Sequence, residues 1–158
     1  MPVSEAHLPP PPPPAANYVP VREAAGVLYV AGQTPHRNGE LRLRGRVGEA
    51  VSVDDARELA GEAALGALAA LKQHLGSLDE IEAIASVTGY VACTPDFALH
   101  PRVIDGASDA LIAVLGERGR HARAAVGVQS LPDGAPVEVS VIALRRLPAR
   151  PAAPTAGV

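Results

Sequence analysis

The 158-residue chain is poor in aromatic residues: it has no tryptophan, one phenylalanine and three tyrosines. Since 47% of the residues are nonetheless hydrophobic, the core must consist mostly of valine, leucine, isoleucine and alanine. This length is enough for one domain with a substantial core but too short for two ordinary domains. We therefore expect a single domain in which small side chains allow close packing of its elements.

Cysteine and long apolar runs are also scarce. Cys93 is the only cysteine and cannot form an internal disulfide, and the N-terminus lacks the cationic and apolar regions of a secretory signal. No stretch approaches the roughly 18 consecutive apolar residues that a membrane-spanning helix needs. We expect a cytoplasmic protein that has no membrane partner.

The chain has no excess of positive charge. Its 14 Lys and Arg residues against 17 Asp and Glu residues leave a formal net charge of -3, and the arginines are scattered along the sequence. Such a chain has no basic stripe that would gather a polyanion, so nucleic acid is not expected as a partner.

Several motifs of metal and nucleotide chemistry are missing from the sequence. The five histidines show no paired metal spacing, and neither HExxH nor CxxC occurs. Glycine-rich phosphate loops and the G-x-S-x-G motif of serine hydrolases are absent as well. We therefore expect neither a metal nor a nucleotide site.

Both ends of the chain are rich in proline. The run from Pro9 to Pro14 lacks amide donors and favours polyproline II, which predicts a disordered arm over residues 1–16. A PxxP ligand for a partner domain is the alternative for this run. A disordered tail is predicted over residues 147–158, so that residues 17–146 form the folded domain.

Two amphipathic helices are predicted. Ser52 followed by two aspartates is typical of a helix N-terminus, and leucine and alanine recur at helical spacing until Gly76. A second helix should span residues 101–115, because proline stands in its first turn and Gly116 follows its last residue.

Strand-like segments cover residues 27–30, 41–47, 90–92, 122–130 and 136–145. Arginines alternate with apolar residues in the second segment and should be solvated or lie at an interface. The last two segments are joined by a Pro-Asp-Gly turn and predict a β-hairpin, in which Val126 would lie opposite Val141 on an apolar face. The order of the elements predicts an α+β domain with one mixed sheet and two helices on the valine side.

The opposite face of this hairpin would carry Arg123, Ala125, Gly127, Gln129, Glu138, Ser140 and Ile142. A face that combines an acid, a base and apolar residues is not expected to remain in water. Oligomerisation through this face is the expected solution.

Three segments of the chain resemble the RidA (YjgF) family. Residues 26–35, Gly-Val-Leu-Tyr-Val-Ala-Gly-Gln-Thr-Pro, resemble the family's strand that ends in Ser-Gly-Gln-x-Pro. Residues 122–128, Leu131-Pro132 and residues 137–143 resemble its C-terminal signature, and Tyr18 stands fourteen residues before Gly32, where the family has a pocket tyrosine. The resemblance covers residues 17–146 and implies a chorismate-mutase-like fold and a homotrimer with clefts between subunits.

The resemblance also implies an activity, the hydrolysis of enamines or imines such as 2-aminoacrylate to 2-oxo acids and ammonia. Arg123 would hold the substrate carboxylate, which suits a planar guanidinium. Glu138 would position water and shuttle its proton. The backbone of Gly32 would contact the ligand, Tyr18 would close the cleft, and no cofactor would be needed. The alternatives are an interface arginine paired with an acid, a solvated strand glutamate and a glycine that serves only a turn or a bulge.

Arg123 and Glu138 would be roughly 20 Å apart along a hairpin, at about 3.3 Å per residue. We therefore hypothesise that they converge across a subunit boundary. Both side chains in one cleft of a single chain would contradict this hypothesis.

The sequence departs from the family pattern at several pocket positions. Ala31 replaces a common serine, Ala125 a frequent cysteine and Ser140 a second common glutamate, while Pro101 stands near the position where many members have a ligand-contacting asparagine. The pocket should lose polar groups and gain room, so the substrate could differ from aminoacrylate. His121 either reaches the cleft as a ligand contact or is an exposed loop residue.

Two other kinds of function remain open at this point. The protein could be a non-catalytic module that binds a carboxylate metabolite, or a member dedicated to one biosynthetic pathway. Ribonuclease activity, a label attached to some members, is disfavoured by the weak basicity of the chain.

Overall fold

The structure of the protein is a computed structural model that describes residues 8–147. The first residues of the predicted arm (1–7) and nearly all of the predicted tail (148–158) lie outside the described residues. The elements are β1 (Val21–Ala24), β2 (Val27–Gln33), β3 (His36–Arg37), β4 (Glu40–Leu41), α1 (Val53–Leu75), β5 (Ile81–Ala92), α2 (His100–Leu115), β6 (Ala122–Val128) and β7 (Val137–Arg145), with short 3-10 turns at Leu78–Glu80, Gly116–Gly119 and Pro132–Gly134.

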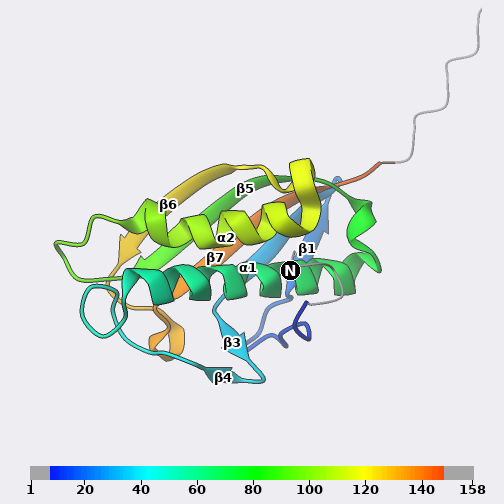
Figure 1. Cartoon of the computed structure of the whole chain (residues 1–158). Helices are drawn as coiled ribbons and strands as arrows, with labels where there is room; N and C mark the ends of the chain where they lie inside the picture. Colours follow the sequence, from blue (N-terminus) through cyan, green and yellow to red (C-terminus); the bar gives the residue numbers. More distant parts are fainter. Residues whose placement is uncertain (1–7, 148–158) are drawn as a thin grey trace, which may run out of the picture.

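The predicted α+β class is confirmed. Five strands form one mixed sheet in the order β1-β2-β7-β5-β6, and α1 and α2 pack together on one of its faces (Figure 1). The core between these layers is aliphatic, with Leu68, Ile84 and Val141 almost completely buried. No helix of residues 8–147 is long and apolar enough to cross a membrane.

Both helices begin and end where their sequences predict. The Ser52 hydroxyl accepts a hydrogen bond from the Asp55 amide at 3.1 Å, and Gly76 ends α1 in the left-handed conformation with φ of 86°. Pro101 stands in the first turn of α2, and Gly116 follows its last residue.

The two helices approach each other through glycine. A Cβ on Gly106 of α2 would collide with the carbonyl oxygen of Arg57 on α1, and a Cβ on Gly61 would lie 3.2 Å from the carbonyl oxygen of Gly106. Backbone therefore packs directly against backbone at this crossing. On the outer side, Arg57 forms an ion pair with Asp109 at 2.7 Å.

The predicted hairpin of β6 and β7 is wrong. β5 lies between these two strands, pairing parallel with β6 and antiparallel with β7. The Pro-Asp-Gly turn reverses the chain locally, but β7 pairs with β2 and β5, so it reaches the middle of the sheet. Pairing both edges of β7, with β2 on one side and β5 on the other, satisfies more backbone groups than an edge hairpin would.

This topology also reverses the predicted orientation of β6. Tyr90 is in register with both Val126 and Glu138, so Val126 shares the open face with Glu138. Val87 is in register with both Arg123 and Val141, so Arg123 lies on the helix side. The prediction for β7 is confirmed, because Val137, Val139 and Val141 are buried under the helices.

The predicted strand over residues 41–47 is also wrong beyond its first residue. Only Glu40–Leu41 is a strand, and it pairs with His36–Arg37 in a small separate sheet. The arginines that follow instead bind other elements: Arg42 pairs with Glu58 on α1 at 3.1 Å, and Arg46 donates to the Gln129 carbonyl at 3.2 Å.

The face of the sheet away from the helices carries exposed apolar side chains. Tyr29, Val126 and Leu144, which are 49%, 40% and 37% exposed, belong to strands β2, β6 and β7. Because these residues come from three strands, they agree with the prediction that this face is open. The prediction for β6 is corrected, because Val126 and not Arg123 points to this face.

Residues 8–16 form neither helix nor strand. Leu8 nevertheless packs against the core, and with Pro9 and Pro11 it borders a hollow beside Ala69 and Gln73 of α1. The proposed boundaries of the folded domain at residues 16 and 147 stay predictions.

Candidate functional site

Glu138 and Gly32, two of the predicted site residues, lie side by side on the open face. Glu138 stands on β7 between buried Val137 and Val139, so its side chain points away from the helices. A Cβ at position 32 would overlap Glu138 Oε1 and lie 2.8 Å from Cδ. The missing side chain of Gly32 therefore makes room for this carboxyl group.

The environment of Glu138 affects its protonation. Burial raises the pKa of the Glu138 carboxyl above its usual value. A carboxyl group with a raised pKa is a stronger base when ionised, and a larger fraction of it is protonated near neutral pH, so both forms needed for proton transfer are accessible. This half-buried group therefore suits proton transfer better than an ordinary surface glutamate.

The raised pKa predicts a pH-dependent effect on stability. When the pKa is raised in the folded state, the group contributes favourably to the free energy of unfolding at low pH. This contribution is complete below the unfolded-state pKa and is lost as the pH rises through the folded-state pKa. We expect Glu138→Gln to increase the free energy of unfolding relative to the wild type at pH 8, and this difference to vanish near pH 4. Urea denaturation at both pH values measures it, with exposed Glu40→Gln as the control. A difference that is independent of pH would contradict the role of desolvation.

Ala31 and the segment of Tyr18 flank this part of the sheet. The Ala31 amide donates to the carbonyl of Pro20 at 2.9 Å, which holds the segment before β1 beside the end of β2. Tyr18 is 46% exposed, and its hydroxyl accepts from the Ala15 amide at 3.2 Å. Tyr18 is thus exposed at the surface, two residues before Pro20.

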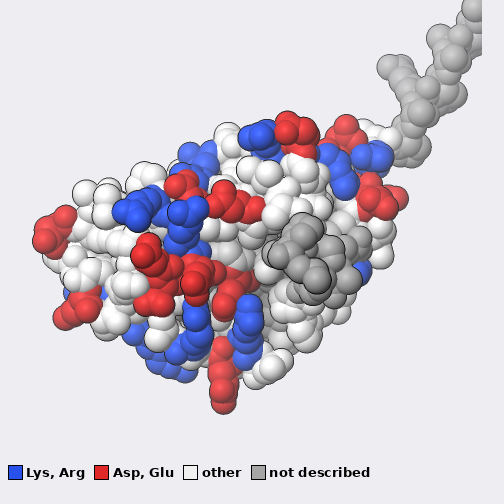
Figure 2. Space-filling model, in the orientation of Figure 1, with Lys and Arg blue, Asp and Glu red and all other residues white. Residues whose placement is uncertain are grey.

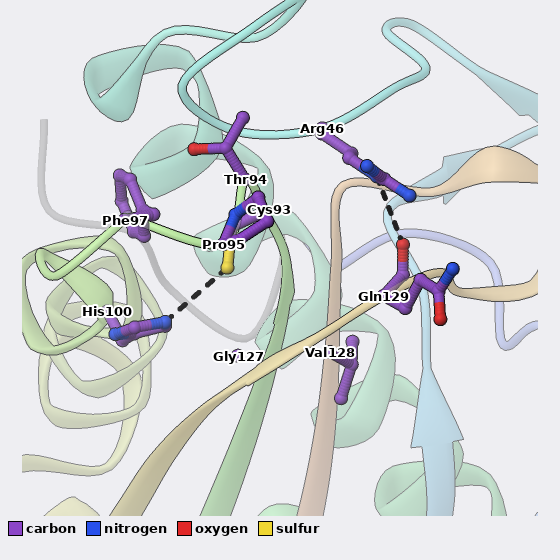
Figure 3. Close-up of a pocket in the computed structure, with 9 residues that line it drawn as sticks. All are labelled: Arg46, Cys93, Thr94, Pro95, Phe97, His100, Gly127, Val128 and Gln129. Atoms are coloured by element: carbon purple, nitrogen blue, oxygen red, sulfur yellow. Dashed lines mark hydrogen bonds between the residues drawn. The ribbon is translucent and has the colours of Figure 1, made fainter.

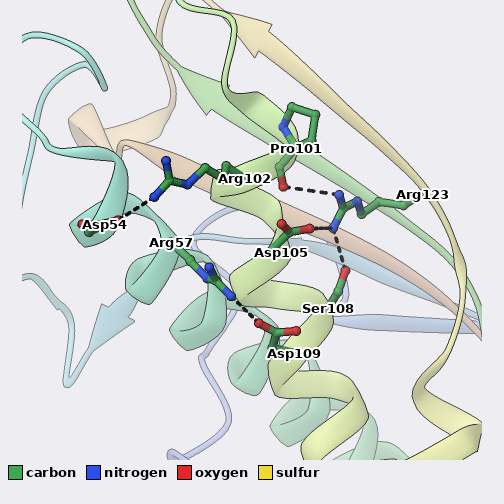
Figure 4. A network of polar contacts seen from close by, with 8 residues as sticks. All are labelled: Asp54, Arg57, Pro101, Arg102, Asp105, Ser108, Asp109 and Arg123. Atoms are coloured by element: carbon green, nitrogen blue, oxygen red, sulfur yellow. Dashed lines mark hydrogen bonds and ion pairs between the residues drawn. The ribbon is translucent and has the colours of Figure 1, made fainter.

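Arg123 is engaged by its own chain (Figure 4). Its Nη1 donates to Asp105 Oδ1 and to Ser108 Oγ, both at 2.9 Å, and its Nη2 donates to the Pro101 carbonyl at 3.3 Å. All three partners belong to α2, so the guanidinium fastens edge strand β6 to this helix. The predicted carboxylate-binding group thus already holds a carboxylate.

His121 belongs to the same cluster. Its Nδ1 lies 2.6 Å from the Gly119 carbonyl, which can only accept, so Nδ1 carries a proton, and its Nε2 is hydrogen-bonded to the Ser108 hydroxyl at 2.9 Å. Ala125 follows Arg123 on the same side of β6. His121 is therefore neither an exposed loop residue nor close to the open face.

The structure divides the predicted site residues into two groups on opposite sides of the sheet. Gly32, Ala31 and Glu138 form one group, and Arg123 belongs to the other. Two strand spacings across and three residues along the sheet place the Cα atoms of Arg123 and Glu138 about 14 Å apart. They do not share a cleft within one chain, so the hypothesis of convergence across a subunit boundary stays a prediction.

A cavity of about 520 Å³ lies beyond the ends of β5 and β6, on the helix side of the sheet (Figure 3). Cys93 follows β5, His100 begins α2, and the Cys93 Sγ is 3.4 Å from His100 Nε2. Arg46 and Gly127 also line this cavity. Sequence reasoning missed it because these residues form no recognised motif, and His100 was considered only as a metal ligand.

The described surface has mixed charge. On the face seen in Figure 2, basic and acidic side chains are interspersed. Ion pairs such as Arg102 with Asp54 at 3.6 Å account for part of this arrangement. In the part of the chain that the structure describes, no group of three His, Cys, Asp or Glu side chains is placed to hold a metal ion.

The two-layer fold, with two helices on one face of a mixed sheet, defines the class of this protein as chorismate-mutase-like. Residues 5–143 match the model of the family described as "YjgF/chorismate_mutase-like, putative endoribonuclease". The chain therefore belongs to the YjgF/RidA family.

Relatives of known sequence and structure agree with this assignment. Protein TCP17 of Trypanosoma cruzi is 36% identical over 136 residues, which cover 85% of each chain. A protein of unknown function from Agrobacterium tumefaciens is 43% identical, with a TM-score of 0.80 and coverage of 82% of this chain and 83% of that one. A "putative endoribonuclease" from Shewanella oneidensis is 31% identical, with a TM-score of 0.83 and coverage of 87% and 91%. These names leave the reaction of this protein open.

Proposed function

We propose that the protein is an enamine and imine deaminase that converts 2-aminoacrylate-like imino acids to 2-oxo acids and ammonia. The observation that carries this proposal is the Glu138 carboxyl group, half-buried beside Gly32 on an open sheet face. Membership of the YjgF/RidA family supports the same choice.

Glu138 would act as the proton carrier of the reaction. Its carboxylate takes a proton from water while the water oxygen bonds to the imine carbon and the C=N electron pair moves to nitrogen. Glu138 then passes this proton to nitrogen, which becomes an amino group. Next, the carboxylate takes the proton of the new hydroxyl group and delivers it to the amino nitrogen. C=O forms as the C–N bond breaks, and ammonia leaves. Positioning and proton transfer are sufficient for this chemistry, because imines already hydrolyse in water.

A homotrimer would bring the two groups of site residues together. Exposed Tyr29, Val126 and Leu144 give the sheet face an apolar surface that another subunit would cover. In such an assembly Glu138 and Gly32 of one subunit would face the edge of β6 in the next. Arg123 would contribute from that edge.

Arg123 can bind a substrate carboxylate only by exchanging a partner. Its Nη1 already donates to Asp105, and this ion pair is partly exposed, with side-chain exposures of 22% and 45%. Exposed ion pairs are weak, so a substrate carboxylate that accepts two parallel bonds can replace Asp105. Asp105→Asn would remove this competition.

The test is the release of 2-oxo acid and ammonia from enzymatically generated 2-aminoacrylate and larger imino acids. Wild-type protein should accelerate hydrolysis, and Glu138→Gln should reduce kcat by about 100-fold or more, as expected for loss of a general base. Asp105→Asn should lower KM, whereas Arg123→Ala should raise it. Absence of acceleration by the wild type on any imino acid would overturn the deaminase proposal.

A non-catalytic module that binds a carboxylate is the second candidate, favoured by the separation of Arg123 from Glu138 within one chain. Calorimetry with 2-oxo acids distinguishes the two. A module would bind the ligand without any turnover, and Glu138→Gln would leave that binding unchanged.

A further inference from the structure

The cavity beyond β5 and β6 contains a thiol–imidazole pair that the proposed deaminase chemistry does not use. Cys93 Sγ and His100 Nε2 are 3.4 Å apart, within hydrogen-bond distance for sulfur. Gly127 makes this approach possible, because a Cβ there would lie 2.6 Å from His100 Nε2 and 3.0 Å from Cys93 Sγ. The Phe97 ring meets the imidazole edge-on at 5.1 Å between centroids. The imidazole is thus held between an aromatic ring and the thiol.

Arg46 supplies a positive charge on the opposite wall of this cavity (Figure 3). Its Nε donates to the Gln129 carbonyl at 3.2 Å, which holds the guanidinium in place. Among residues 8–147 no carboxylate forms an ion pair with it, in contrast to Arg42, Arg57 and Arg123. A held guanidinium without an acidic partner beside a cavity is suited to binding an anion.

The volume of about 520 Å³ falls within the range of small-molecule sites. The cavity therefore combines space, a cation, a nucleophile and a base in one place. Each of these features is common by itself. Together they indicate that the ligand is an anion and that the Cys93 sulfur is the atom that reacts with it.

We propose that this cavity binds small α,β-unsaturated carboxylates, with Arg46 holding the carboxylate and Cys93 adding to the β-carbon while His100 accepts the thiol proton. The addition forms one S–C bond and moves the C=C electron pair to the α-carbon. His100 then returns the proton to the α-carbon, so that the product is a thioether and no other reactant is needed. This proposal is independent of the deaminase reaction.

The protonation state of the Cys93 thiol explains why the proposed addition requires His100. Burial raises the pKa of the Cys93 thiol, and the Val128 backbone and the charge of Arg46 offset this effect only in part. The thiolate is the nucleophile, so a protonated thiol needs a neighbouring base. His100 occupies that position.

The first experiment compares alkylation of the folded protein by iodoacetate, which is anionic, and by neutral iodoacetamide. Because Cys93 is the only cysteine, intact-protein mass spectrometry follows it without ambiguity. The urea-unfolded protein gives the intrinsic ratio of the two rates. We expect folding to shift this ratio at least about tenfold toward iodoacetate, as for an opposite charge near the thiol. An unchanged ratio would overturn the anion site.

Three variants assign the roles. Arg46→Gln should abolish the preference for iodoacetate, while Arg22→Gln, which removes an equal charge from β1 at the opposite edge of the sheet, should retain it. His100→Gln should slow both reagents to a similar extent, and circular dichroism verifies that each variant is folded. A preference that survives Arg46→Gln, or rates that survive His100→Gln, would contradict the respective role.

The second experiment uses the ligand class itself. Folded protein incubated with acrylate should gain one adduct of acrylate mass. The rate of adduct formation in the folded protein, divided by the rate in the unfolded protein, should be higher for acrylate than for acrylamide. Slower or equal addition of acrylate would overturn the proposal for unsaturated carboxylates.

Discussion

Gly106→Ala should lower the free energy of unfolding by about 3 kcal/mol, which corresponds to a decrease in Tm of roughly 6–12 °C for a domain of this size. The added methyl group would collide with the Arg57 carbonyl oxygen, which belongs to the backbone of α1 and cannot rotate away. The helices would have to separate, and the aliphatic contacts between them and the sheet would weaken. Thermal and urea denaturation measure the loss.

Gly66→Ala is the matched control for this prediction. Gly66 is also a helical glycine, but a Cβ there would make an ordinary contact with Gln33 Oε1 at 3.5 Å. Alanine is favoured over glycine in a helix interior, so this variant should gain about 0.5–1 kcal/mol. Equal stability of the two variants would show that the crossing of α1 and α2 tolerates an additional methyl group.

Gly32→Ala should reduce imine hydrolysis by about 100-fold, as much as loss of the Glu138 carboxyl group itself. The methyl group would occupy the position of Glu138 Oε1, so the carboxyl group would have to rotate out of its place beside β2. Steady-state kinetics on the best imino acid, with kcat as the quantity compared, tests this expectation.

The same experiment distinguishes the effect on kcat of moving the carboxyl group from the effect of removing it. Gly66→Ala again serves as the control, because it adds a methyl group without touching Glu138. If Gly32→Ala retained wild-type kcat while Glu138→Gln lost it, the precise position of the carboxyl group beside Gly32 would be unimportant. If both variants were fully active, Glu138 would not be the proton carrier.

The two groups of the proposed site, Glu138 and Arg123, are held in place by different contacts. Glu138 depends on a vacancy that a glycine leaves in the neighbouring strand, whereas Arg123 depends on three acceptors of α2. Substitutions in α2 should therefore alter substrate affinity through Arg123 and leave the position of Glu138 unchanged. This separation follows from their location on opposite sides of the sheet.

The sequence by itself determined the local features of this protein. Ser52, Gly76, Pro101 and Gly116 indicated the ends of the helices, because capping and backbone conformation depend on nearby residues. The alternation of valines in β7 likewise indicated its buried face. The resemblance correctly identified the family, since its motifs combine short segments in a set order.

Only the tertiary structure decided which strands are neighbours. The Pro-Asp-Gly turn was compatible with a hairpin, but β5, distant in sequence, separates β6 from β7. Pairing partners depend on the burial of the whole sheet, and a wrong partner inverts the predicted face of a strand. For that reason Arg123 was assigned to the open face although it binds α2, and the proximity of Cys93, His100 and Arg46, which come from three separate segments, was not foreseen.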